Sequence, residues 1–238
     1  MKAIFLTSGP AFTYKNEKGN IVPTKLENKE LVECLKNEIE NYNNILLVCS
    51  SPDNYDKTDK YSEGIVKSLS LSGLKFKMSD VLDSRNALFS RSLILNSDLV
   101  IFMGGDPLDQ ITFFNDIEMK DILKRYKGVL LGISAGTMNM AGKVYFSKDE
   151  SIEDTVYYKG LGLTNINVEP HFDVNDEVRI NEILLRDSMK QPFIALPDES
   201  FIIIKKEETR LYGDAYYFST GKYEKIDNLN KVLGNNND

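Results

Sequence analysis

Short apolar runs alternate along this chain with segments of helical periodicity. Four runs have the pattern of strands buried on both faces: Ala3–Thr7, Ile45–Cys49, Leu99–Phe102 and Val129–Ile133. The helical segments between them are Asn28–Tyr42 (with Asn28 as N-cap), Asp59–Leu71 and Pro107–Tyr126. Because this alternation is typical of parallel strands joined by crossover helices, we predict an α/β fold with a mostly parallel sheet flanked by helices.

The second half of the chain has a looser pattern. We expect further strands at Leu74–Met78, Thr164–Val168 and Phe193–Leu196, a polar loop at Ser147–Lys159, a helix at Asp176–Met189, an antiparallel edge at Phe201–Ile204 and Leu211–Phe218, and a frayed tail at Gly234–Asp238. The chain has 238 residues and no evident repeat or linker. A single domain over residues 1–238 is therefore predicted.

Composition and charge exclude several classes of partner. The net charge of −7 disfavours non-specific binding to nucleic acid or anionic lipid. The first apolar run is shorter than the core of a signal peptide, and no segment approaches the ~18 apolar residues of a membrane span. Cys34 and Cys49 both lie in apolar patterns and are predicted to be buried free thiols. We therefore expect a cytoplasmic protein with no nucleic-acid or membrane partner.

The segment Gly132-Ile133-Ser134-Ala135-Gly136 lies between a predicted strand and a predicted helix. This is the context of a nucleophile elbow, in which the glycines permit a tight turn that exposes the serine. Ser134 is therefore the candidate nucleophile. The N–H of Ala135 lies at the helix start and is a candidate oxyanion donor. The alternative is an ordinary turn made of small residues.

His171 is the single histidine of the chain and follows Pro170, which restricts the backbone before it. An imidazole has an unperturbed pKa near neutrality, so His171 is the candidate general base for Ser134. The alternative is a surface histidine without a catalytic role. A second oxyanion donor is expected at Gly105, because Gly104-Gly105 follows a buried strand; this pair also fits a simple strand-exit turn.

Taken together, the Gly104-Gly105 strand exit, the Ser134 elbow and Pro170-His171-Phe172 resemble the peptidase S51 family, which includes the dipeptidase E and cyanophycinase group. The resemblance implies a fold similar to class I glutamine amidotransferases (flavodoxin-like), with serine in place of their cysteine. It implies a Ser-His-acid triad without metal or cofactor, and an oxyanion hole from the Gly105 and Ala135 N–H groups.

In dipeptidase E the acid lies about 15 residues after the serine, which corresponds to Asp149 in this chain. Glu150, Glu169 and Asp173 remain alternatives for the acid, because the first neighbours Asp149 and the other two flank the histidine. The carboxylate would hold the imidazole in the required tautomer and stabilise its protonated form.

The resemblance predicts a serine peptidase that hydrolyses short peptides, with a preference for an N-terminal Asp residue. Arg179 is the candidate for binding a substrate carboxylate; an ion pair with Glu182 or another nearby acid is the alternative. Other functions stay open: a cyanophycinase-like or isoaspartyl peptidase, an esterase, and a catalytically silent binding protein. The sequence also leaves a homodimer open.

Overall fold

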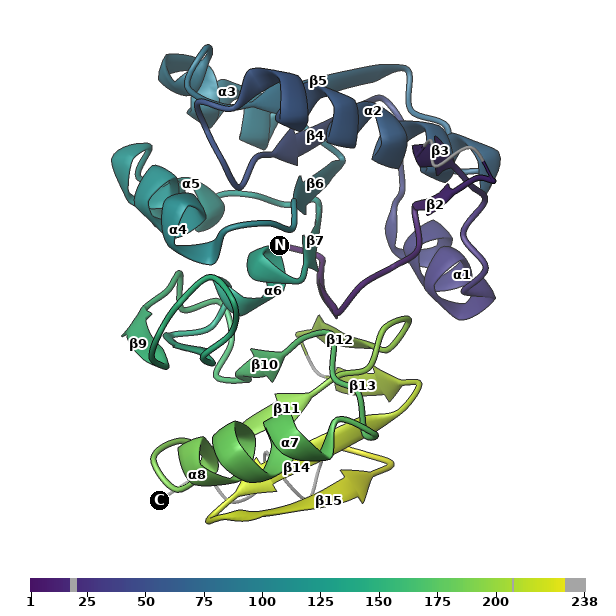
Figure 1. Ribbon diagram of the computed structural model, residues 1–238. Coiled ribbons are helices and arrows are strands. Elements are labelled where there is room, and N and C mark those ends of the chain that lie inside the picture. Colours follow the sequence, from purple (N-terminus) through teal and green to yellow (C-terminus); the bar gives the residue numbers. More distant parts are fainter. Residues whose placement is uncertain (18–20, 207, 230–238) are drawn as a thin grey trace.

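The computed structural model describes residues 1–17, 21–206 and 208–229, so the predicted fraying of Gly234–Asp238 lies outside the described residues. Its largest element is a seven-stranded sheet (Figure 1). In spatial order the strands are β13 (Glu208–Tyr212), β12 (Phe201–Lys205), β1 (Ala3–Thr7), β7 (Val129–Ile133), β6 (Leu99–Phe102), β4 (Asn44–Val48) and β5 (Met78–Leu82). Five neighbouring strands run parallel to one another: β1, β7, β6, β4 and β5. The other two strands, β12 and β13, add an antiparallel edge beside β1.

Helices cover both faces of this sheet. They are α1 (Lys29–Glu38), α2 (Tyr55–Leu71), α3 (Ser90–Leu95), α4 (Pro107–Asp116), α5 (Met119–Leu123) and the single turn α6 (Ala135–Met138), with a 3₁₀ turn η1 (Ala87–Phe89) before α3. On one face, Phe5 packs in a cluster with residues of α1 and α2. On the other, its neighbour Leu6 packs with residues of α4 and α5. The alternation of side chains along β1 therefore divides the core into two layers, as a helix-covered sheet requires.

A second sheet forms the lower part of the molecule in Figure 1. Its strands are β10 (Val168–Glu169), β11 (Phe193–Ala195), β14 (Ala215–Ser219) and β15 (Lys222–Ile226). A helical segment made of α7 (Glu177–Arg179), the π-helical turn η2 (Ile180–Leu184) and α8 (Leu185–Ser188) packs against it. Phe172, Phe193, Tyr216 and Phe218 form an aromatic cluster in this layer. Two further antiparallel strand pairs are described: β2 (Thr13–Lys15) with β3 (Ile21–Pro23), and β8 (Lys143–Phe146) with β9 (Val156–Lys159).

The predicted α/β architecture is confirmed, but several element boundaries differ from the prediction. The strand expected at Leu74–Met78 is wrong, because β5 begins at Met78; it is an edge strand whose first three residues are exposed, so it has no continuous apolar run. The helix expected at Pro107–Tyr126 divides where Glu118 adopts a φ of 53°. The segment Leu211–Phe218 divides at Gly213, with a φ of 78°, and sends β13 and β14 into different sheets.

Two predictions for the middle of the chain also change. Part of the predicted loop Ser147–Lys159 is strand β9, and the strand predicted at Thr164–Val168 is limited to the short β10. Cys49 is buried and Cys34 is partly buried, and neither forms a disulfide. Within the described ranges, no helix combines the length and the apolar character needed to cross a bilayer.

Candidate active site

Ser134 lies in a strained turn between β7 and α6, with a φ of 48° and a ψ of −108°. The glycines on either side make this turn feasible. A Cβ on Gly136 would lie 2.2 Å from the carbonyl oxygen of Phe102, and a Cβ on Gly132 would lie 2.7 Å from the backbone nitrogen of Thr137. The Ser134 N–H donates to the carbonyl of Ser8 over 3.0 Å. This is the geometry predicted for a nucleophile elbow.

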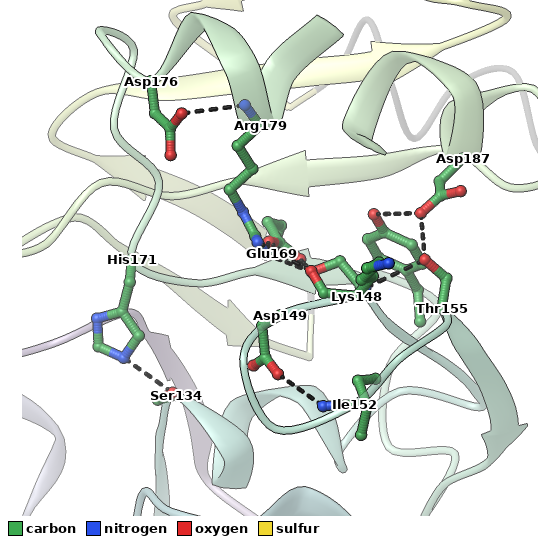
Figure 2. Close-up of polar contacts among 12 residues, drawn as sticks. Ser134, Lys148, Asp149, Ile152, Thr155, Glu169, His171, Asp176, Arg179 and Asp187 are labelled. Carbon is green, nitrogen blue, oxygen red and sulfur yellow. Dashed lines mark hydrogen bonds and ion pairs between the residues drawn. The ribbon is translucent and has the colours of Figure 1, made fainter. Parts of the chain in front are cut away.

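His171 lies beside this serine. Its Nε2 is 2.9 Å from the Oγ of Ser134, so the predicted contact between the two side chains is present (Figure 2). The histidine follows β10, and its backbone has a φ of 55°. Its N–H donates to the Oγ of Ser8 over 2.7 Å. The imidazole therefore approaches from the second sheet, whereas the hydroxyl belongs to the first.

The carboxylate that contacts His171 belongs to Asp198 and not to Asp149, which corrects the prediction. His171 Nδ1 is 2.7 Å from Asp198 Oδ1. Asp149 lies in the loop between β8 and β9, where its Oδ1 accepts a hydrogen bond from the N–H of Ser151. It also accepts one from the N–H of Ile152 (Figure 2). The alternative Glu169 is also engaged elsewhere, with Arg179.

The strand order explains why Asp198 reaches the histidine. β10 and β11 are parallel neighbours, and their pairing continues where the Phe172 N–H donates to the Leu196 carbonyl. The segments after the two strands therefore leave the sheet at the same edge. Asp198 follows the predicted strand Phe193–Leu196 by two residues, a position typical of site residues, but the sequence does not show that this strand pairs with the one before His171.

The hydrogen bond from His171 lowers the pKa of Asp198 below its ordinary value, although partial burial opposes the shift. The Ser8 hydroxyl donates to the same oxygen, Oδ1, over 3.1 Å. Gly9 allows the close approach of the pair, because a Cβ there would lie 2.3 Å from Asp198 Oδ1 and 2.9 Å from His171 Cε1. Asp198 thus remains an anionic partner for the imidazole at neutral pH.

Gly105 and Ala135, the two candidate oxyanion donors, line the same pocket as Ser134 and His171. Gly105 has a φ of 140°, and a Cβ there would lie 2.1 Å from the Oγ of Ser50, so the position requires glycine. Ala135 is the first residue of α6, so its N–H has no acceptor within that helix. Both backbones are therefore placed beside the serine.

The pocket has a volume of about 520 Å³, and Arg179 lies in its wall. The Nη2 of Arg179 donates to Glu169 Oε1 and to Ser147 Oγ, both over 2.5 Å, and its Nη1 donates to the carbonyl of Lys148 over 3.0 Å. The alternative reading of Arg179 as one half of an ion pair is thus present, with Glu169 in place of Glu182. Burial raises the pKa of Glu169, while the guanidinium and the Ser147 hydroxyl oppose the shift.

Comparison with known proteins places the chain in a family. The profile of Peptidase family S51 matches residues 19–212. The chain belongs to this family. It is 24% identical over 191 residues to a protein named Peptidase E from Nostoc sp. (strain PCC 7120 / SAG 25.82 / UTEX 2576), a match that covers 73% of this chain and 76% of the relative.

A solved structure shares the fold of this S51 chain. It is a crystal structure of a protein assigned as a peptidase E from Listeria monocytogenes EGD-e, with a TM-score of 0.62 and 16% sequence identity. The match covers 89% of this chain and 98% of the other. The flavodoxin-like arrangement predicted for the central sheet is thus shown. Within the part of the chain that the structure describes, no group of three or more His, Cys, Asp or Glu side chains is placed to hold a metal ion.

Proposed function

We propose that this S51 peptidase is a serine-type enzyme that hydrolyses short peptides. The observation that carries the proposal is the chain of contacts from Asp198 through His171 to Ser134, at an elbow that opens into a pocket. A carboxylate, an imidazole and a hydroxyl in this order are the parts of a serine hydrolase triad, whatever their order along the sequence.

In the proposed mechanism, Ser134 Oγ attacks the carbonyl carbon of the peptide bond while His171 Nε2 accepts its proton. Asp198 stabilises the imidazolium and keeps Nδ1 protonated. The N–H groups of Gly105 and Ala135 stabilise the oxyanion of the tetrahedral intermediate. His171 then protonates the leaving amine, and water releases the acyl group from Ser134 by the same steps in reverse.

The size of the pocket supports a short substrate. A volume of about 520 Å³ is in the range of small-molecule sites and accommodates a few residues of a peptide. The preference for N-terminal Asp stays a prediction from the family resemblance. Arg179, the candidate for binding a substrate carboxylate, already donates hydrogen bonds to Glu169 and Ser147. We therefore propose hydrolysis of short peptides but not a preference for N-terminal Asp. A cytoplasmic location and a homodimer likewise stay predictions.

The test is a panel of dipeptides and tripeptides assayed with the wild-type protein and with Ser134→Ala. The panel includes N-terminal Asp peptides, β-linked aspartyl peptides for the cyanophycinase-like alternative, and esters for the esterase alternative. We expect peptide turnover by the wild type and a loss of at least about a thousandfold in kcat for the variant. Unchanged turnover in Ser134→Ala would contradict the proposal, and turnover of esters alone would favour the esterase.

A further inference from the structure

The guanidinium of Arg179 is compensated by a buried carboxylate inside the pocket wall. The Glu169 side chain is 3% exposed and that of Arg179 is 30% exposed. The Ser147 hydroxyl donates to both carboxylate oxygens of Glu169 over 2.8 and 2.9 Å, so the carboxylate is held by two side chains. Figure 2 shows Arg179 reaching from α7 to Glu169, with the Asp149 loop beside this pair. Arg179 therefore contributes little net positive charge to the pocket.

The remaining charges of the pocket are negative. Its lining includes three carboxylates, from Asp106, Asp149 and Glu169, and one guanidinium, from Arg179. Two of these carboxylates have no compensating cation among the lining residues. A separate, larger hollow of about 810 Å³, which α4 also lines, has four further aspartates and no lysine or arginine among its lining residues. Within about 10 Å of these groups, an acidic side chain would be repelled at moderate ionic strength.

We propose that Glu169 is a specificity-determining residue, which neutralises Arg179 and so directs the pocket toward peptides whose N-terminal residue is uncharged or basic. The inference rests on the proposed function, since it concerns the residue that Ser134 would attack. The same contact indicates which change would create a preference for an acidic N-terminal residue. Removing the charge of Glu169 while keeping its shape would leave the Arg179 guanidinium free to bind a substrate carboxylate.

The experiment compares two dipeptides of equal shape, Asp-Leu and Asn-Leu, which differ in one charge. For the wild type we expect kcat/KM to be at least about tenfold higher for Asn-Leu. For Glu169→Gln we expect the ratio of kcat/KM values to shift toward Asp-Leu by about tenfold or more. Glu169→Gln/Arg179→Gln is the matched control, because it removes one charge of each sign. Its ratio should return to within about threefold of the wild-type ratio.

Binding separates this inference from the proposed function. The dissociation constants of both dipeptides are measured in the Ser134→Ala background, where turnover is not required. The proposed function fails if the wild type cleaves no peptide of the panel, and the binding ratios then decide the inference by the same criteria. A wild-type preference for Asp-Leu, an unchanged ratio in Glu169→Gln, or no binding of either dipeptide would overturn it. Because a wild-type preference for Asp-Leu would by itself overturn the inference, the inference stays testable even if Glu169→Gln does not fold.

Discussion

At the scale of single residues, Ser8 joins the three members of the proposed triad. Its carbonyl accepts the N–H of Ser134, and its hydroxyl accepts the N–H of His171 and donates to Asp198. Ser8 itself is fully buried, whereas the side chains of His171 and Asp198 are partly exposed. Ser8 directly follows β1, the strand between β7 and β12. One buried residue just beyond the end of β1 thus contacts Ser134, His171 and Asp198, the three residues of the proposed triad.

Asp198 and Asp149 are distinguished by a pair of conservative variants. We expect Asp198→Asn to lower kcat by about 10³–10⁴-fold, because an amide can donate to Nδ1 and favour the wrong tautomer of His171. Asp149→Asn keeps the loop and does not touch the imidazole, so kcat should change by less than about tenfold. Steady-state kinetics on any cleaved dipeptide decides the matter, and equal losses in the two variants would contradict the assignment.

The lowered pKa of Asp198 also has a consequence for stability. A carboxylate with a depressed pKa in the folded state stabilises the protein above its unfolded pKa, about 3.9, and loses this contribution as pH falls through the folded value. The difference in Tm between the wild type and Asp198→Asn should therefore be constant near neutral pH. It should shrink below about pH 4 in a thermal scan.

At the scale of elements, the buried strands and the elbow were predictable from sequence because each has a local signal. Continuous apolar runs mark β1, β4, β6 and β7, and small residues mark the turn at Ser134. The edge strand β5 lacks such a signal, since most of its residues face solvent. The acid was missed for a different reason, because its position depends on the pairing of β10 with β11, which no local pattern encodes.

The elbow itself gives a matched pair of glycine variants. In Gly136→Ala the new Cβ would lie 2.2 Å from the backbone oxygen of Phe102, so β6 or α6 must shift. We expect a loss of at least about 2 kcal/mol in the free energy of unfolding, together with loss of activity. Gly142→Ala places its Cβ 3.8 Å from the nearest atom and should stay within about 0.5 kcal/mol of the wild type. Urea denaturation measures both, and equal costs would refute the steric argument.

At the scale of the whole molecule, the site forms where two sheets meet. Ser134 follows β7 of the seven-stranded sheet, while His171 and Asp198 follow β10 and β11 of the four-stranded sheet. The distance between nucleophile and base therefore depends on how the second sheet is packed. Its aromatic cluster includes Phe172, the residue next to His171.

Weakening this cluster should affect catalysis as well as stability. Phe218 packs against Phe193 and Phe172, with ring centroids 5.0 and 5.6 Å apart. Phe218→Ala is expected to cost about 3–5 kcal/mol and to lower kcat severalfold in the folded protein, because the His171 segment loses its support. Leu35→Ala in α1 is the control, since it removes a buried side chain of the main core and should lower stability without changing kcat. Kinetics well below Tm separates the two variants.

Asp198 lies on the stretch that crosses from the four-stranded sheet to β12, and β12 then pairs with β1. During synthesis the serine emerges from the ribosome dozens of residues before that crossing is made. In a nascent chain the Ser134 hydroxyl would thus precede both His171 and Asp198, so the proposed triad would be complete only after the β11–β12 segment has folded. If the proposed function holds, the order of strands along the chain makes hydrolysis one of the last properties to be acquired during folding.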